Sequence, residues 1–285
     1  MAPRKTAPIK PSSTAAKERR LQEILTSLGR VVVGFSGGVD STFLLKTASD
    51  VLGRDNVLAV VAGSETYPPR EVREARRLAR FLKIPHKTIH TREIENPEFA
   101  KNPPLRCYYC KGELWTEMKK IAEAKGFPHI VDGSNADDTN DYRPGARASR
   151  ERGVRSPLQE AGMTKDEIRR LSKRAGLPTW NKPSLACLAS RFPYGTAIER
   201  KTLIQVGKAE DFLRGLGFGQ LRVRHHKTIA RIEVTPAEFA KIMRPRIRER
   251  IVARLKKLGY VYITLDLAGY RTGSMNEPLK KSGDT

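Results

Sequence analysis

The chain has 285 residues, 39% of them hydrophobic, which is enough for one medium-sized domain with a buried core and a smaller second one. Its 54 Lys and Arg residues outnumber 31 Asp and Glu residues and give a net charge of +23, which indicates anionic partners such as nucleotides, phosphorylated small molecules or nucleic acid. No apolar run approaches membrane-spanning length and the N-terminus lacks the apolar region of a signal peptide. We therefore expect a cytoplasmic protein without membrane contact.

The first 20 residues are rich in Pro, Ser, Ala, Thr, Lys and Arg and predict a disordered basic tail. An amphipathic helix follows and ends at Gly29. Residues 31–35 are an apolar run typical of a buried parallel strand, and helical spacing begins again at Phe43. Between them lies the turn Ser36-Gly37-Gly38-Val39-Asp40-Ser41.

A strand, a Gly-Gly turn and a helix N-terminus together form an anion site, because the glycines let backbone N–H groups approach a ligand and the helix dipole favours negative charge. Ser36 and Ser41 can donate hydroxyls to phosphate, and Asp40 can hold Mg²⁺ or orient the loop. The alternative is a plain glycine turn between a strand and a helix.

These six residues resemble the PP-loop, S-G-G-x-D-S, of the ATP pyrophosphatases. The resemblance implies that the loop binds the pyrophosphate of ATP while an acceptor attacks the α-phosphate and becomes adenylated. The predicted ATP-binding residues are those of the loop and of the ends of three strands: Gly34, Ser36, Gly37, Gly38, Asp40, Ser41, Ser64 and Gly133.

Strand and helix patterns alternate along the first two thirds of the chain. Strands are expected at 57–61, at 86–90 and up to Val131, with helices at 70–82 and 113–125 between them. This alternation predicts an α/β fold with a doubly wound parallel sheet, whose ligands bind at the carboxyl ends of the strands.

Residues 139–157 have a loop-like pattern, and a capping box at Thr164 opens a helix to about Ala175. Beyond residue 190 the pattern changes to a smaller α+β unit, with a helix near 198–216, three strands and two further helices. The predicted organisation is a tail (1–20), a PP-loop domain (21–190), a small C-terminal domain for substrate binding or oligomerisation (191–270) and a second tail (271–285).

The chain has three cysteines, Cys107 and Cys110 in a C-x-x-C motif and Cys187 far from them. A cytoplasmic protein with an odd number of cysteines is not expected to hold structural disulfides. The three thiols could bind zinc together with a fourth ligand, or hold a four-iron–four-sulfur cluster that leaves one iron open. They could also be unrelated thiols, or a redox pair and a bystander.

The stretch 183–195, which contains Cys187, resembles the cysteine motif of the LarE family, and residues 133–145 and 219–225 also look like that family. The resemblance runs from about residue 21 to 243. It implies an ATP-dependent sulfur transferase that adenylates a carboxylate of pyridinium-3,5-biscarboxylic acid mononucleotide and replaces oxygen with sulfur, on the route to the nickel-pincer nucleotide. It also implies a homo-oligomer built through the smaller domain.

One type within this family gives up the sulfur of its single motif cysteine, whereas another holds an iron–sulfur cluster. Because this chain also has Cys107 and Cys110, it is similar to the cluster type, in which all three cysteines are catalytic cluster ligands. The expected cofactors are ATP, Mg²⁺ and a 4Fe-4S cluster. The sequence identifies neither the sulfide source nor, by itself, which type is correct.

Arg222 and Arg224 alternate on one face of a strand and could bind a phosphate or carboxylate of the substrate, or simply be solvated. Arg106 could bind an anionic substrate or be a surface charge. His225 is expected to be structural or exposed. Asp137 and the residue after it could hold Mg²⁺ or cap a turn.

An iron–sulfur-dependent tRNA thiolation enzyme is the alternative function, and a non-enzymatic nucleotide sensor is a third. Residues 1–20 carry six Lys or Arg against one Glu, and residues 241–257 carry eight against one. Because this charge is peripheral to the expected catalytic sheet, a small anionic nucleotide-like substrate is favoured over RNA.

Overall fold

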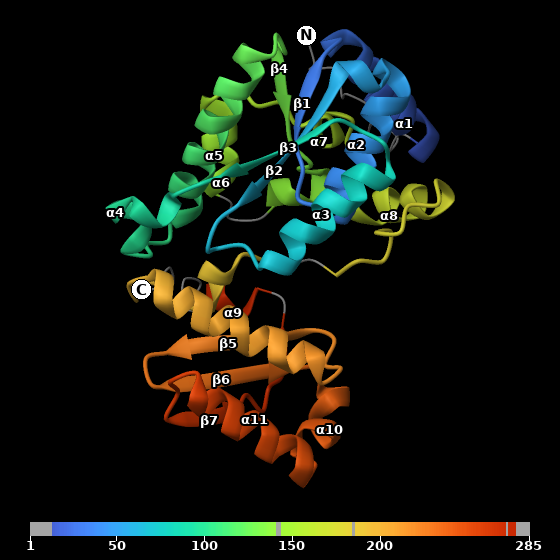
Figure 1. The fold of residues 1–285 in the computed structure, drawn as a ribbon. Helices are drawn as coiled ribbons and strands as arrows, with labels where there is room; N and C mark the ends of the chain where they lie inside the picture. Colours follow the sequence, from blue (N-terminus) through green and yellow to red (C-terminus); the bar gives the residue numbers. More distant parts are fainter. Residues whose placement is uncertain (1–12, 141–143, 184–185, 272, 278–285) are drawn as a thin grey trace, which may run out of the picture.

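The computed structural model describes residues 13–140, 144–183, 186–271 and 273–277 (Figure 1). The helices are α1 (Thr14–Leu28), α2 (Val39–Leu52), α3 (Pro69–Phe81), α4 (Pro97–Ala100), α5 (Arg106–Ala124), α6 (Pro144–Glu151), α7 (Pro157–Glu160), α8 (Lys165–Arg174), α9 (Arg200–Gly215), α10 (Phe239–Met243) and α11 (Pro245–Lys257). The strands are β1 (Val31–Gly34), β2 (Val57–Gly63), β3 (His86–His90), β4 (His129–Val131), β5 (Leu221–His226), β6 (Ile229–Val234) and β7 (Tyr262–Leu265).

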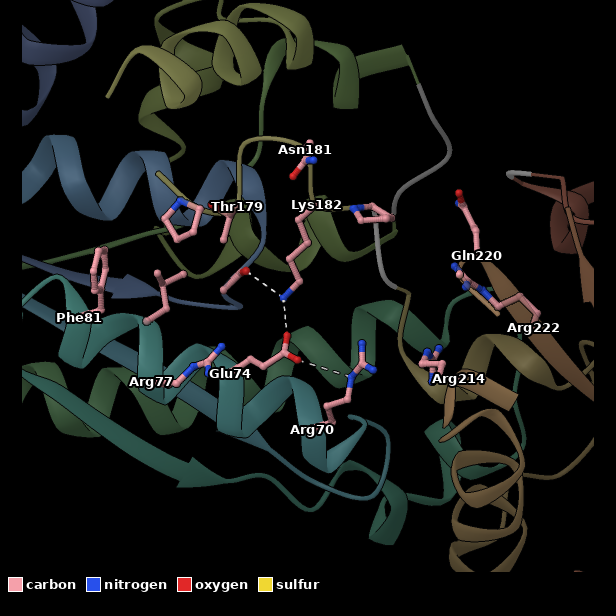
Figure 2. A pocket seen from close by; sticks show the side chains of 15 residues that line it. Arg70, Glu74, Arg77, Phe81, Thr179, Asn181, Lys182, Arg214, Gln220 and Arg222 are labelled. Carbon is pink, nitrogen blue, oxygen red and sulfur yellow. Dashed lines mark hydrogen bonds and ion pairs between the residues drawn. The ribbon is translucent and has the colours of Figure 1, made fainter. Parts of the chain in front are cut away.

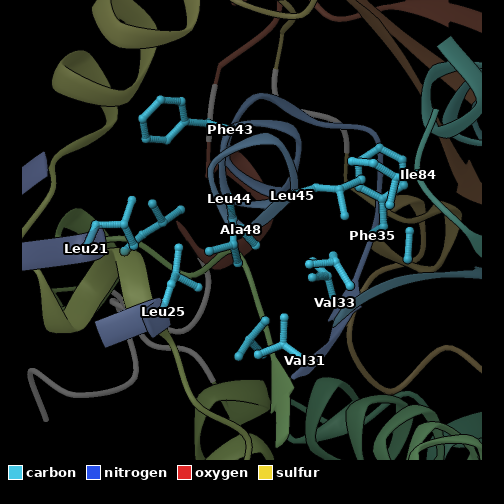
Figure 3. Packing of buried hydrophobic residues seen from close by; sticks show 14 of the residues in the cluster. Leu21, Leu25, Val31, Val33, Phe35, Phe43, Leu44, Leu45, Ala48 and Ile84 are labelled. Carbon is cyan, nitrogen blue, oxygen red and sulfur yellow. The ribbon is translucent and has the colours of Figure 1, made fainter. Parts of the chain in front are cut away.

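The first unit is a parallel sheet with strand order β3-β2-β1-β4, which confirms the predicted α/β fold. Alternate residues of β1 enter different cores: Val31 and Val33 pack with α1, α2, α3 and α8, and Val32 packs with α5. Figure 3 shows the first of these cores, with Leu21 of α1 and Phe43 of α2. Because β2 and β4 flank β1 on opposite sides, the loop after β1 opens at the topological switch point of the sheet.

Three predicted boundaries differ from the structure. The first helix begins at Thr14, so the predicted 20-residue tail is too long: Ser13 caps the helix and Lys17 pairs with Glu167 of α8. The helix expected at 113–125 begins at Arg106. The stretch 139–157, expected to be loop-like, contains α6, which buries Ala148 against α5.

The second unit lies below the parallel sheet in Figure 1 and contains α9, α10, α11 and a three-stranded sheet. In this sheet β5 and β6 are antiparallel, whereas β6 and β7 are parallel. Leu213 of α9, Val223 of β5 and Leu255 of α11 pack in its separate core. None of the helices in the described part of the chain combines the length and hydropathy needed to cross a bilayer.

A small apolar cluster joins the two units. Phe99 of α4 packs there with Leu188 and Phe192, which follow Cys187, and with Val206 of α9. Cys110 and Cys187 lie against the same cluster. The segment that contains Cys187 is thereby brought next to the start of α5, although most of a domain separates the two in sequence.

Candidate active site

The PP-loop links β1 to α2 in the conformation expected for an anion site. Gly37 has a φ of +68°, and a Cβ there would lie 3.0 Å from Ala75 of α3, so both its backbone and its surroundings require glycine. Ser36 and Ser41 are hydrogen-bonded through their hydroxyls at 3.0 Å. Gly38 is the N-cap of α2 and no side chain caps the helix, which leaves its N-terminus available to phosphate.

Asp40 has one carboxylate oxygen free for a cation. Its Oδ2 forms an ion pair with Lys165 at the start of α8, whereas its Oδ1 is buried and has no hydrogen-bond partner. Gly133, at the end of β4, lies so close to the loop that a Cβ would be 2.9 Å from the backbone nitrogen of Ser41. The predicted group of Ser36, Gly37, Gly38, Asp40, Ser41 and Gly133 is thus brought together, as expected for the carboxyl edge of the sheet.

A cavity of about 700 Å³ opens beside the loop, between the two units (Figure 2). The N-terminal unit contributes Gly37 and residues of α3 and of 178–183, and the C-terminal unit contributes Arg214, Gln220 and Arg222. Lys182 lines the N-terminal side of the cavity, and its Nζ lies 3.2 Å from the Gly37 carbonyl oxygen and 2.9 Å from Glu71.

The cavity is positively charged. Its charged lining side chains in the described part of the chain are Arg70, Glu74, Arg77, Lys182, Arg214 and Arg222. Burial and the neighbouring charge of Arg191 lower the pKa of Arg222 to about 10, so the guanidinium stays charged at neutral pH. An anionic ligand that fits this volume would therefore find complementary charge next to the PP-loop.

Arg222 and Arg224 lie on the same face of β5, as predicted, but their surroundings differ. Arg222 lines the cavity and stacks on Tyr270. Arg224 does not point into it: Nε and Nη2 donate to both carboxylate oxygens of Glu233 at 2.9 Å, and Nη1 donates to the Ser190 carbonyl at 2.7 Å. Glu233 on β6 and the Ser190 carbonyl thus occupy donors of Arg224, and its contact with substrate stays a prediction.

Arg191, four residues after Cys187, also holds the backbone around Cys187 through hydrogen bonds. Its side chain is fully buried and forms a two-pronged ion pair with Glu210 of α9, at 2.8 and 3.1 Å. Its Nη1 also donates to the carbonyl oxygens of Ala186 and Cys187, both at 3.1 Å. Arg191 and Arg224 together fix the backbone on both sides of the Cys187 thiol.

Cys110 and Cys187 lie against the same apolar cluster, where the start of α5 meets the segment that follows Cys187. Cys107 is exposed on the first turn of α5, and Cys110 lies one turn later on the same face. Burial, and then the negative charges of Glu93 and Cys187, raise the pKa of the Cys110 thiol, with a smaller effect from Cys107. Cys107 and Cys187 thus lie near enough to Cys110 to affect its pKa, and the convergence of all three on one cluster stays a prediction.

Two other predicted site residues belong to the surroundings of the cysteines. Ser64, expected at ATP, donates to Glu93 at 2.6 Å. Arg106, expected at the substrate, is buried and directs its terminal nitrogens to Asn102 (2.7 Å) and to the sulfur of Met275 (3.2 Å). Neither side chain reaches the cavity of Figure 2, because each is held by a partner that the sequence did not place.

The remaining predictions concern structural positions. Gly34 is a packing glycine, since a Cβ would lie 3.1 Å from the ring of Trp115. His225 is buried and hydrogen-bonded to Tyr260, as expected for a structural histidine. Asp137 accepts a hydrogen bond from the Lys165 backbone at 2.8 Å, so it supports the start of α8.

Four residues that sequence reasoning did not single out contribute to the site: Glu93, Lys165, Lys182 and Arg191. Lys165 opens the capping-box helix, Lys182 directly precedes the stretch 183–195 and Arg191 lies within it, so their positions at these motifs were the available signal. Nothing local distinguishes Glu93 from the other glutamates.

Comparison with known proteins extends these findings. A family model described as NAD synthase matches residues 16–102, the part that contains the PP-loop. A pyridinium-3,5-bisthiocarboxylic acid mononucleotide synthase of Lactiplantibacillus plantarum is 42% identical over 95% of this chain and 98% of its own length.

Two uncharacterised proteins are also similar over most of their length. One, from Synechocystis, is 42% identical over 93% of this chain and 99% of its own length. Another, from Methanocaldococcus jannaschii, is 27% identical over 85% of this chain and 91% of its own length. On the full-length similarity to the Lactiplantibacillus enzyme, and with the PP-loop geometry above, the chain belongs to the pyridinium-3,5-bisthiocarboxylic acid mononucleotide synthase (LarE) family.

Proposed function

We propose that this protein is an ATP-dependent sulfur transferase that acts on pyridinium-3,5-biscarboxylic acid mononucleotide in the synthesis of the nickel-pincer nucleotide. The observation that carries the proposal is the 42% identity over 95% of the chain to a synthase of the bisthiocarboxylic acid mononucleotide. A PP-loop, a cavity lined mostly by cationic side chains, and Cys110 and Cys187 against one apolar cluster support this proposal.

The PP-loop is the proposed site of adenylation. A substrate carboxylate oxygen attacks the α-phosphorus of ATP, an acyl adenylate forms, and pyrophosphate leaves. The N-terminus of α2 and the hydroxyls of Ser36 and Ser41 stabilise the departing pyrophosphate. Mg²⁺ fits the buried, unpartnered Oδ1 of Asp40 and would neutralise phosphate charge there.

The positive cavity between the units is the proposed substrate site. Its volume of about 700 Å³ is in the range of small-molecule sites, and the guanidinium groups of Arg77 and Arg222 that line it can pair with the phosphate and carboxylate groups of a nucleotide-like anion. Because Gly37 lines the same cavity, a bound substrate would lie next to the loop that holds ATP.

Cys107, Cys110 and Cys187 are the proposed ligands of a 4Fe-4S cluster. The donor set fits, since thiolates are the usual ligands of such clusters, and three of them leave one iron without a protein thiolate. In the described ranges no three His, Cys, Asp or Glu side chains, these cysteines included, are close enough to hold a single metal ion. When bound, the cluster would supply the sulfur nucleophile.

Sulfur transfer then completes the reaction. Attack of a sulfur nucleophile on the acyl carbon would release AMP with the former carboxylate oxygen and leave a thiocarboxylate. Arg191 and Arg224 hold the Cys187 segment in place during this step. The alternative in this family, sacrifice of the Cys187 sulfur, would leave Cys107 and Cys110 without a role.

We further infer that the protein forms a homo-oligomer through the C-terminal unit. Val261 and Tyr262, at the edge strand β7, are 52% and 62% exposed, and Leu267 just beyond is 85% exposed. Apolar side chains at an open sheet edge favour contact with a second copy of the chain.

A single reaction mixture tests the function. Anaerobically purified protein is incubated with ATP, Mg²⁺, hydrosulfide and pyridinium-3,5-biscarboxylic acid mononucleotide, and pyrophosphate and the mass of the nucleotide are measured. We expect pyrophosphate release that depends on the mononucleotide. The mass of the mononucleotide should rise by the difference between a sulfur and an oxygen atom for each oxygen that is replaced. Thiolated tRNA in place of thiolated mononucleotide, or no pyrophosphate at all, would contradict the proposal.

A further inference from the structure

Glu93 is a buried carboxylate with one oxygen held and the other free. Glu93 is the first residue of the 3-10 turn Glu93–Glu95 and is 1% exposed. Oε1 accepts hydrogen bonds from Ser64 (2.6 Å) and Thr66 (2.5 Å), whereas Oε2 is buried without a partner. No Lys, Arg or His of the described residues forms an ion pair with it. Burying such a group is costly unless a cation completes it.

Two connections place Glu93 beside the cysteines. The carbonyl of Thr66 accepts from the backbone N–H of Leu188, next to Cys187, at 2.7 Å. On the other side, the backbone N–H of Arg92 donates to Glu113 of α5, the helix that carries Cys107 and Cys110.

The side chains around Glu93 agree with this placement. Ile94, Cys110 and Cys187 pack on one apolar cluster. The negative charge of Glu93 contributes to raising the pKa of Cys110 and of the buried Tyr67, after the larger effect of burial.

We propose that Oε2 of Glu93 is the protein ligand to the cluster iron that Cys107, Cys110 and Cys187 leave without a thiolate, an inference that rests on the cluster proposed above. The iron would supply the cation that the buried carboxylate lacks. Ser64 and Thr66 hold Oε1 and thereby aim Oε2. A carboxylate oxygen is a harder ligand than sulfur and suits iron in a sulfur cluster less well, so Glu93 can yield its place to an incoming hydrosulfide.

The test asks what occupies this iron. Anaerobically reconstituted protein is reduced, and its electron paramagnetic resonance spectrum is recorded in ordinary water and in ¹⁷O-labelled water. We expect no ¹⁷O broadening in the unsubstituted protein, because Glu93 excludes water, and broadening in Glu93→Gln, whose amide is a poor ligand. Glu93→Gln should also be half-saturated by hydrosulfide at a concentration at least fivefold lower.

Glu95→Gln is the matched control, since Glu95 lies in the same turn but is exposed and pairs with Arg200 at 3.6 Å. It should behave as the unsubstituted protein. Broadening by ¹⁷O in the unsubstituted protein would overturn the assignment and needs no variant to fold. Equal spectra and equal hydrosulfide affinity for Glu93→Gln would overturn it as well. Absence of iron from the unsubstituted protein would refute the cluster instead, so the two failures are distinguishable.

Discussion

Arg191 and Glu210 form an ion pair with both side chains completely buried, and the same guanidinium donates to the carbonyl of Cys187. Burial tends to raise the pKa of Glu210, but the adjacent charge of Arg191 lowers it, so the carboxylate remains ionised. The pair connects α9 of the C-terminal unit to the backbone of the cysteine segment. Removing the charge of Glu210 would leave the Arg191 guanidinium buried without an ion-pair partner among the described residues.

Arg191→Lys tests whether this connection positions Cys187. The ammonium keeps the charge but cannot bridge Glu210 and the two carbonyls with the geometry of a guanidinium. We expect a several-fold loss of iron per protein after reconstitution. Arg214→Lys is the matched control, because Arg214 also pairs with Glu210, at 2.9 Å, but donates no hydrogen bond to the described residues of 183–195. Full iron loading of Arg191→Lys would contradict the positioning role.

Asp40→Ala tests the PP-loop. We expect substrate-dependent pyrophosphate release to fall about 100-fold or more, because the ligand for Mg²⁺ and the partner of Lys165 are both lost. The circular dichroism spectrum should not change, since Asp40 is outside the apolar core. Asp50→Ala, on the exposed end of the same helix, should retain activity. Normal turnover by folded Asp40→Ala would exclude this loop as the adenylation site.

Arg222 and Arg224 should respond differently to the same change. Arg222→Gln removes a charge from the cavity, and we expect the KM for the mononucleotide to rise about 10- to 100-fold, as for loss of a charge-assisted hydrogen bond of about 1.5–3 kcal/mol. Arg224→Gln leaves Glu233 buried with a weakened partner, so the free energy of unfolding should fall by about 3 kcal/mol. Urea unfolding and initial rates distinguish them. A raised KM in Arg224→Gln together with a lowered free energy of unfolding in Arg222→Gln would contradict both assignments.

Much of this site follows from local sequence. The PP-loop is a contiguous strand, turn and helix whose shape is determined by neighbours in the chain, so this conformation was predicted correctly, whereas the binding of ATP by Ser36 to Ser41 stays a prediction. The parity of β5 also predicts correctly that Arg222 and Arg224 share a face. The alternation of side chains along β5 does not reveal that Glu233 of the next strand accepts hydrogen bonds from Arg224.

Residues whose role depends on distant partners could not be found this way. Glu93 meets Ser64 because β2 and the segment after β3 end at the same sheet edge. Lys182 reaches Gly37 across 145 positions of sequence. The start of α1 at Thr14 likewise depends on Glu167 of α8, a contact between elements that no local pattern contains.

The acid limit of stability should depend on Glu167. Burial tends to raise its pKa, but the backbone and hydroxyl of Thr164 and the ammonium of Lys17 lower it from the ordinary 4.5 to about 2. Its contribution to the free energy of unfolding, about 3 kcal/mol, is therefore present above pH 4.5 and is lost as the pH falls toward 2.

Urea unfolding of Glu167→Gln and the unsubstituted protein measures this contribution. The two should differ most at pH 7 and converge between pH 4.5 and 2. Glu123→Gln, on an exposed site of α5, should show no such difference. A constant difference across this pH range would mean that ionisation of Glu167 contributes nothing.

The most direct test of the central claim is the iron and acid-labile sulfide content of anaerobically purified protein, alongside its activity. We expect four of each per chain in the unsubstituted protein. Cys107→Ser, Cys110→Ser and Cys187→Ser should each lower iron and thiocarboxylate formation together. Loss of activity in Cys187→Ser alone, with mild effects of the other two and one sulfur missing from the mass of the spent protein, would contradict the cluster and assign the sulfur to Cys187 itself.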